Sequence, residues 1–164
     1  MRRINKRIIN THCLRVLCVL LGFLASSLAQ ASDIADAAMA GDFGQVNALI
    51  SQGIDVNEAQ VDGNTALHWA VRFDDLDMAT RLMAAGADVA AVNRVSAPPM
   101  LLAAINGSAA MLELLLDHGA DPNAPLSVTG DTPLMIAART GLPEAVNVLL
   151  EANAEINARE FWGG

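Results

Sequence analysis

Histidine and cysteine, which often bind metals or take part in catalysis, occur only three times and twice in this chain of 164 residues. Its histidines are His12, His68 and His118. Asp117 and Asp121 lie close to His118 and could join it in a metal site, but no second histidine lies at ligand spacing. A position at the carboxyl end of a helix, where a positive charge is favoured, accounts for His118 without a metal. We therefore predict no metal site here.

Three neighbouring acidic residues, Asp74, Asp75 and Asp77, suggest a calcium loop. The segment lacks the glycine and the distal glutamate of such a loop, however. Acidic residues at the start of a helix stabilise it through the helix dipole, and we expect these three there. The sequence also contains no serine in a glycine elbow and no glycine-rich phosphate loop. It therefore predicts a protein with no catalytic residues and no cofactor, which is not an enzyme.

Charge is divided unevenly along the chain, whose formal net charge is -8. The first 31 residues contain five basic residues and no acidic residue. From Ser32 onward, five arginines and no lysine stand against all 18 acidic residues. So acidic a surface repels nucleic acids and anionic membranes, and we expect no nucleic-acid partner. The hydrophobic content of 53% also excludes a disordered polymer.

The first 31 residues have the layout of a secretory signal peptide. Arg2, Arg3 and Lys6 belong to a basic segment, an apolar run follows over 16–28, and residues 29–31 provide the small residues of a cleavage site. The apolar run is shorter than the ~20 residues of a membrane-spanning helix, so a retained anchor fits less well. A twin-arginine signal also fits poorly, because no apolar pair follows where one is expected. We predict cleavage before Ser32, export to the periplasm or beyond, and membrane contact only through this signal.

Both cysteines, Cys13 and Cys18, lie inside the predicted signal peptide. After its removal the chain would contain no thiol, and therefore no disulfide and no thiolate metal site. We expect the stability of the mature chain to come from packing alone. A chain without thiols also suits an oxidising compartment.

The rest of the chain repeats with a period of 33 or 34 residues. One block contains an apolar pair, then a glycine or asparagine, then an acidic residue, and its glycine or asparagine recurs as Gly53, Gly86, Gly119 and Asn153. The second block reads T-A-L-H-W-A at 65–70, P-P-M-L-L-A at 98–103 and T-P-L-M-I-A at 132–137. A regular period of this length is typical of repeat proteins.

These two blocks resemble the ankyrin repeat, whose signature contains T-P-L-H and G-A-D-V-N. The resemblance covers essentially everything after Ser32. It implies an all-α fold: an ankyrin-repeat solenoid of stacked helix-turn-helix units with projecting β-turn or hairpin loops. The predicted segments are a signal peptide at 1–31, an N-terminal capping repeat at 32–60, repeats at 61–93, 94–127 and 128–158, and the start of an incomplete repeat at 159–164.

Local signals agree with this fold. Thr65 and Thr132 can cap the first helix of a unit, and Gly107 and Gly141 can end one. Pro98 replaces threonine in the third unit, where we expect weaker capping. No unit can bury its own apolar face, so neighbouring units must stack.

The repeat register also predicts the roles of individual residues. The resemblance implies a structural role for His68, because ankyrin repeats use a histidine there to bond neighbouring turns. We place Trp69 in the core. Asp36 stands where the next unit has Trp69, which indicates a polar amino-terminal cap. The apolar side of the fourth unit, near Leu149 and Leu150, would be poorly covered, so we expect these residues to be the front of a longer protein.

The resemblance also implies a binding surface, because similar proteins bind partners on a concave face made of turn tips and the exposed ends of the first helices. The register places these candidates on it: Arg72, Phe73, Arg94, Ile105, Asn106, Arg139, Thr140, Phe161 and Trp162. Four of the five arginines after Ser32 lie on or beside it, including Arg159. We hypothesise a cationic, partly aromatic patch that binds carboxylates of a protein partner with an acidic surface. The alternative is that arginine favours turns and helix ends on any solvated surface.

Together these features predict an exported, non-enzymatic protein-protein interaction module. The main alternative is a set of N-terminal docking repeats of a longer exported enzyme truncated at Gly164, and a purely structural scaffold comes third. The sequence makes no prediction of an oligomeric state.

Overall fold

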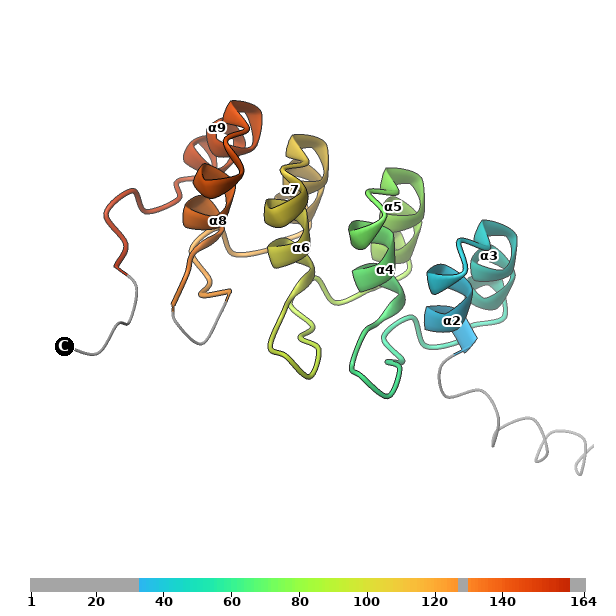
Figure 1. Cartoon of the computed structure of the whole chain (residues 1–164). Helices are drawn as coiled ribbons and strands as arrows, with labels where there is room; N and C mark the ends of the chain where they lie inside the picture. Colours follow the sequence, from blue (N-terminus) through green and yellow to red (C-terminus); the bar gives the residue numbers. More distant parts are fainter. Residues whose placement is uncertain (1–32, 127–129, 160–164) are drawn as a thin grey trace, which may run out of the picture. The chain divides into compact units, whose positions relative to one another are not determined.

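The structure is a computed structural model of the chain, and it describes residues 33–126 and 130–159. All regular elements in this part are α-helices, which form four successive pairs (Figure 1). Residues 1–32, which include the predicted signal peptide, and residues 127–129 and 160–164 lie outside the described part. None of the helices in the described ranges is both long and apolar enough to cross a membrane.

Each pair consists of a first helix of seven or eight residues and a second helix of nine. The pairs are α2 (Asp33–Met39) with α3 (Phe43–Ser51), α4 (Ala66–Arg72) with α5 (Leu76–Ala84), α6 (Pro99–Asn106) with α7 (Ala109–Asp117), and α8 (Pro133–Thr140) with α9 (Pro143–Glu151).

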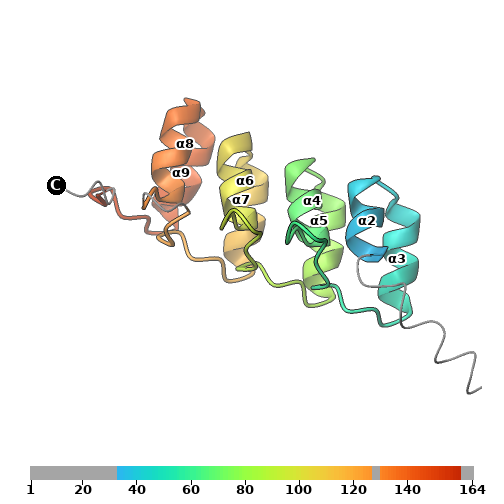
Figure 2. The same cartoon turned by 60° about the horizontal axis from the view of Figure 1, so that its bottom comes forward.

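The helix pairs stack in the order in which they occur in the chain. First helices contact the first helices of the neighbouring pairs, from α2 through α4 and α6 to α8, and second helices do the same from α3 through α5 and α7 to α9. The loops before α4, α6 and α8 project from the same side of the stack (Figures 1 and 2). The predicted all-α class and the predicted stacking of helix pairs are therefore confirmed.

Side chains at the helix starts satisfy backbone N–H groups as expected. The Thr132 hydroxyl accepts a hydrogen bond from the Met135 N–H at 3.4 Å. Pro98 makes no such bond at the start of α6, which confirms the weaker capping of the third pair. Asp75 caps α5 by accepting from the Met78 N–H at 2.9 Å. This confirms the predicted place of the Asp74–Asp77 segment at a helix start.

Left-handed residues end the helices where the sequence predicted breaks. Gly107 and Gly141 end α6 and α8 with φ of 67° and 74°. Gly63, in the loop before α4, has a φ of 85°, and a Cβ there would lie 2.9 Å from backbone atoms of Asn93 and Arg94 in the next loop. Only glycine therefore allows these two loops to approach so closely.

The core lies between the helix pairs, where residues such as Leu67, Leu112 and Leu149 are fully buried. The complete burial of Leu149 corrects the expectation that it would be poorly covered, because α9 packs it against α7 and α8. Leu150 is 39% exposed and Ala138 is exposed, so the outer side of the fourth pair is only partly covered.

Asparagine amides in the loops that follow the second helices join the first pair to the second and the third pair to the fourth. Asn57 donates from Nδ2 to the Gly86 carbonyl at 3.0 Å and accepts at Oδ1 from the Asp88 N–H at 2.7 Å. Asn123 repeats this pattern with the loop after α9, at 3.3 and 2.7 Å. Ala90 occupies the corresponding position between the second and third pairs and has no amide. The loops of the stack are thus held together by polar bonds as well as by apolar packing.

Candidate protein-interaction surface

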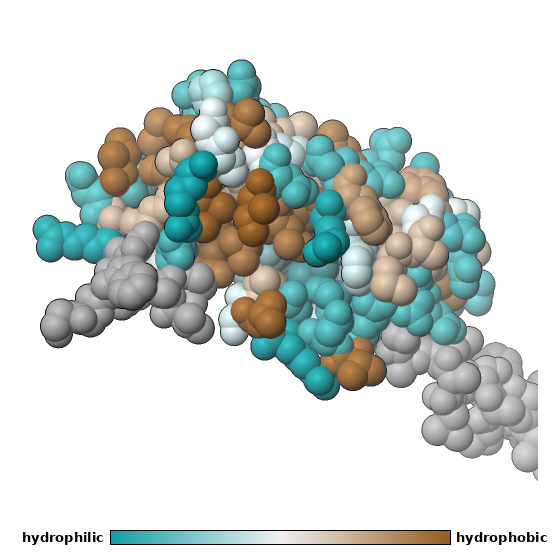
Figure 3. Space-filling model, in the orientation of Figure 1, coloured by the Kyte–Doolittle hydropathy of each residue, from teal (hydrophilic) through white to brown (hydrophobic). Residues whose placement is uncertain are grey.

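The first helices and the loops projecting beside them form one surface, which we call the first-helix surface. It comprises the exposed sides of α2, α4, α6 and α8 and the loops at 60–64 and 93–97. Half of the ten large apolar residues that are exposed in the described part lie on it: Met39, Val61, Phe73, Val95 and Ile105. Figure 3 shows apolar area over the middle of the stack, bordered by hydrophilic side chains. A gathering of apolar residues on one face is typical of an interaction site.

A first hollow of about 610 Å³ opens between α2, α4 and the two loops. Its apolar lining comes from Met39, Val61 and Trp69. Its polar lining comes from Asp36, Gln60, Asp62 and Arg94. The hollow therefore combines an aromatic wall with a guanidinium group and acidic groups.

Trp69 is the centre of an aromatic and cationic cluster beside this hollow. Its ring stacks on Phe73 with the centroids 5.9 Å apart, and the Arg72 guanidinium carbon lies 5.8 Å from the indole centroid. The indole Nε1–H donates to Gln60 Oε1 at 2.7 Å. These contacts orient the indole and place a positive charge beside the hollow.

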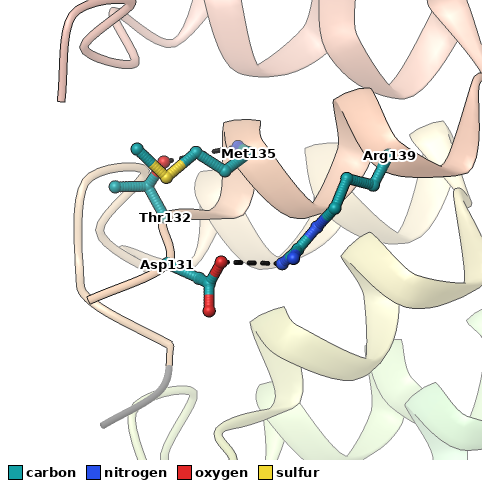
Figure 4. A network of polar contacts seen from close by, with 4 residues as sticks. All are labelled: Asp131, Thr132, Met135 and Arg139. Atoms are coloured by element: carbon teal, nitrogen blue, oxygen red, sulfur yellow. Dashed lines mark hydrogen bonds and ion pairs between the residues drawn. The ribbon is translucent and has the colours of Figure 1, made fainter. Parts of the chain in front are cut away.

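A second hollow of about 280 Å³ lies between α6 and α8. It is lined by Ile105, Ile136, Arg139 and Thr140, and Ile105 is 55% exposed. The Arg139 side chain turns toward the loop before α8, where Nη2 pairs with Asp131 Oδ1 at 2.7 Å (Figure 4). The Asp131 side chain is only 12% exposed whereas that of Arg139 is 61% exposed, so the guanidinium is oriented but still accessible.

The structure brings most of the predicted site residues together in these two places. Arg72, Phe73 and Arg94 lie in or beside the first hollow, and Ile105, Arg139 and Thr140 line the second. The predicted Phe161 and Trp162 lie outside the described residues, and Arg159 is exposed in the segment after α9.

Asn106 has a structural role in addition to its place on this surface. Its side-chain amide donates to the Val71 carbonyl at 2.9 Å, near the end of α4. The bond links α6 back to the preceding pair and satisfies a carbonyl at a helix end. Thr140 is also bonded within its helix, because its hydroxyl donates to the Ala137 carbonyl at 2.6 Å.

Trp69 was expected in the core, and the structure corrects this in part. Its ring packs against the core but remains half-buried, and one side lines the first hollow. The signal was present in the sequence: Trp69 precedes Arg72 and Phe73 by three and four positions, which places all three on one side of a helix. Gln60 and Ile136 also line hollows, and sequence reasoning did not single them out.

The charges of this surface are nearly balanced. Arg72, Arg94 and Arg139 lie among four aspartates, Asp33, Asp36, Asp62 and Asp131. The rest of the chain after Ser32 holds two arginines and fourteen acidic residues. The first-helix surface is thus far less negative than the remainder, although it is mixed rather than purely cationic.

His68 lies behind this surface and is fully engaged in hydrogen bonds. Nδ1 accepts from the Thr65 N–H at 3.1 Å and lies 2.8 Å from the Thr65 hydroxyl, while Nε2 lies 3.0 Å from the Ala97 carbonyl. An N–H group can only donate, so Nδ1 carries no proton and Nε2–H donates to Ala97. Burial lowers the pKa of His68, partly offset by the Ala97 carbonyl and the charge of Asp62. The ring therefore joins the second and third pairs, as the repeat resemblance implied.

His118 terminates α7, where its Nδ1–H donates to the Leu114 carbonyl at 2.8 Å. This confirms its predicted place at the carboxyl end of a helix. Within residues 33–126 and 130–159, no group of three or more histidine, cysteine, aspartate or glutamate side chains is arranged to hold a metal ion.

Comparison with known proteins shows where this architecture belongs. Residues 34–83 match a family described as ankyrin repeats (many copies), and residues 81–160 match one described as ankyrin repeats (3 copies). Neurogenic locus notch homolog protein 1 of Xenopus tropicalis is 29% identical over 143 residues, 87% of this chain and 5% of that protein. Cyclin-dependent kinase 4 inhibitor B of Rattus norvegicus is 41% identical over 83 residues, 51% of this chain and 63% of the relative.

A further relative is the ankyrin repeat domain-containing protein SAT10 of Stachybotrys chartarum, which is 34% identical over 120 residues, 73% of this chain and 6% of that protein. The chain thus spans only part of the length of each of these three relatives. Their similarity and the two family matches cover nearly all residues that form the stack of helix pairs. The chain therefore belongs to the ankyrin repeat family.

Proposed function

We propose that this chain is a non-enzymatic module that binds another protein through the first-helix surface. The observation that carries the proposal is the pair of hollows, each formed by side chains of adjacent helix pairs and each containing exposed apolar residues beside an arginine. The ankyrin family supports a role in protein-protein interaction, and one relative is named as the inhibitor of a kinase. Apolar contact area with aromatic and arginine side chains is typical of the energetic centre of an interface.

The proposed partner presents an acidic surface to the three arginines. Arg72 is exposed above Trp69, Arg94 lines the first hollow, and Arg139 lines the second. A guanidinium has five N–H donors in a planar fork that matches a carboxylate. The strongly negative remainder of the chain would repel an acidic partner elsewhere, so charge favours approach to this surface.

We also propose that the chain acts after export, as its predicted signal peptide indicates. Amino-terminal sequencing of protein recovered from the compartment outside the cytoplasm tests this directly. We expect the sequence to begin at Ser32. Recovery of the chain only in the cytoplasm, starting at Met1, would contradict export.

Charge reversal tests the interaction surface itself. A partner identified by cross-linking in the exported fraction should bind the Arg72→Glu, Arg139→Glu variant at least tenfold more weakly than the parent chain. The matched control is Arg81→Glu on α5, where the arginine lies over Phe43 and lines a separate hollow between α3 and α5. We expect the control to bind like the parent. Equal binding by all three proteins, each with an unchanged helical circular dichroism spectrum, would disprove the proposed surface.

A further inference from the structure

We infer that the partner contributes an extended segment with two apolar anchor residues, five or six positions apart, each accompanied by a carboxylate. This inference rests on the proposed function, because it assumes that the first-helix surface is the binding site. It adds the shape, the spacing and the chemical class of what binds there. The two hollows, their separation and their arginines carry the inference.

The two hollows differ in size and in lining, so they favour different anchors. The first has about 610 Å³ and an indole wall, which suits an aromatic side chain that can stack on Trp69. Polar atoms of Gln60 and Asp62 lie at the same hollow and could accept a hydrogen bond from a phenol or an indole. The second has about 280 Å³ and is walled by Ile105 and Ile136, which suits a branched aliphatic side chain.

The distance between the hollows follows from the stacking of the pairs. The first hollow lies between α2 and α4, and the second lies between α6 and α8. Packed helices are about 8–10 Å apart, so two steps along the stack separate the hollows by about 16–20 Å. An extended chain advances about 3.3 Å per residue. Five or six residues of an extended segment therefore reach from one hollow to the other.

An extended segment is favoured over a helical one because fewer of its residues must become ordered on binding. A helix rises about 1.5 Å per residue and would need about 12 residues to span the same distance. Ordering each residue opposes binding, and an isolated helix of that length is marginal in water. The extended form reaches both hollows with half as many ordered residues.

The arginine at each hollow favours a negatively charged residue beside each anchor. Arg94 lines the first hollow and Arg72 stands beside it over Trp69. Arg139 lines the second, and its side chain is 61% exposed although Nη2 pairs with Asp131. A carboxylate one or two residues from each anchor could reach these guanidinium groups.

Selection from a library of displayed random 12-residue peptides tests this inference on the purified chain. We expect enriched peptides to hold an aromatic residue and, five or six positions away, a branched aliphatic residue, with aspartate or glutamate within two positions of each. Moving the second anchor by three positions in a synthetic peptide should weaken binding at least tenfold. Enriched peptides with no fixed spacing, or with anchors 11 or 12 positions apart, would overturn the inference.

Variants of the chain separate failure of the inference from failure of the proposed function. Ile105→Glu and Arg94→Glu change exposed side chains of the second and first hollow, with Arg81→Glu as the control. If binding depends on both hollow residues but shows no two-anchor spacing, the inference fails and the proposed function stands. If no peptide is enriched, the inference fails. If only the control variant weakens binding of the cross-linked partner, the proposed function fails as well.

The two anchors should also be assignable to their hollows by double-mutant cycles. Ile105→Glu should weaken binding of the selected peptide about tenfold but have little effect on a peptide whose aliphatic anchor is replaced by serine. Arg94→Glu should behave in the same way toward the carboxylate beside the aromatic anchor. Independent, additive effects in both cycles would overturn the assignment of each anchor to its hollow.

Discussion

Replacing His68 by leucine should destabilise the stack at the junction of its second and third pairs. Leu101 stands at the corresponding position of the third pair, so a leucine side chain is compatible with this place in a first helix. In the second pair, however, leucine would leave the Thr65 N–H without its ring partner. It would also remove the bond from the ring to the Ala97 carbonyl, which would keep only the Asn93 N–H. His68 is only 1% exposed, so water cannot replace the ring easily.

The magnitude follows from these lost bonds. A buried donor or acceptor without a partner lowers the free energy of unfolding by about 1–3 kcal/mol. Burial of the apolar leucine side chain offsets part of this loss. We expect His68→Leu to lower the free energy of unfolding by about 2–4 kcal/mol. Urea denaturation at pH 7.5, followed by circular dichroism at 222 nm, measures the change. His118→Gln on the exposed end of α7 is the matched control and should change stability by less than about 1 kcal/mol.

The pH dependence of the same measurement tests the cause. The pKa of His68 is lowered in the folded chain, so the unfolded chain binds a proton more readily. The ring therefore contributes its full stabilisation above the ordinary pKa of about 6.5, and this contribution falls as the pH drops below that value. The parent chain should lose stability between pH 7.5 and 5 through this group, and His68→Leu should lose less. An equal pH dependence of the two proteins would refute the hydrogen-bonding scheme.

Three further predictions concern the loops that join the helix pairs. Gly63→Ala should lower the free energy of unfolding, measured in urea, by about 2 kcal/mol or more, because φ is positive and backbone atoms block the Cβ. Gly53 also has a positive φ but open space around it, so Gly53→Ala should lower the same free energy by only about 1 kcal/mol. Asn123→Ala should lower the free energy of unfolding by about 1–2 kcal/mol and speed amide hydrogen exchange in α8 and α9. Asn157→Ala is the control and should change neither the stability nor the exchange rates. Ala90→Asn should add the missing amide bridge and raise stability by about 0.5–1.5 kcal/mol, and Ala90→Gln, whose amide is displaced by one carbon, should not.

The fold could be predicted from the sequence because the same pattern of residues recurs in successive units. Apolar pairs, left-handed positions and threonine or proline helix starts recur at a nearly constant period. In a solenoid each unit contacts only its neighbours, so such local signals suffice to define the architecture. The capping role of Asp75 and the helix-ending roles of Gly107 and Gly141 were accessible for the same reason.

The surface was less predictable, because register shows which side of a helix a residue occupies but not which side chains bond to each other. The pairing of Arg139 with Asp131 depends on the path of the loop before α8. The bond from Asn106 to the Val71 carbonyl depends on how closely α6 approaches the end of α4. Both distances arise from packing between pairs, which periodicity alone does not specify.

Packing and the proposed recognition mostly use different side chains in this chain. The residues that hold the stack, such as Leu67 and Leu112, are buried, whereas Ile105 and Arg139 of the two hollows are exposed and can change without opening the core. Trp69 contributes to both, since it packs against the core and lines the first hollow. A ligand that stacks on this indole therefore contacts a side chain already fixed by the fold, so little side-chain freedom is lost on binding. The first hollow should consequently contribute more to affinity than the second, where Ile105 is 55% exposed.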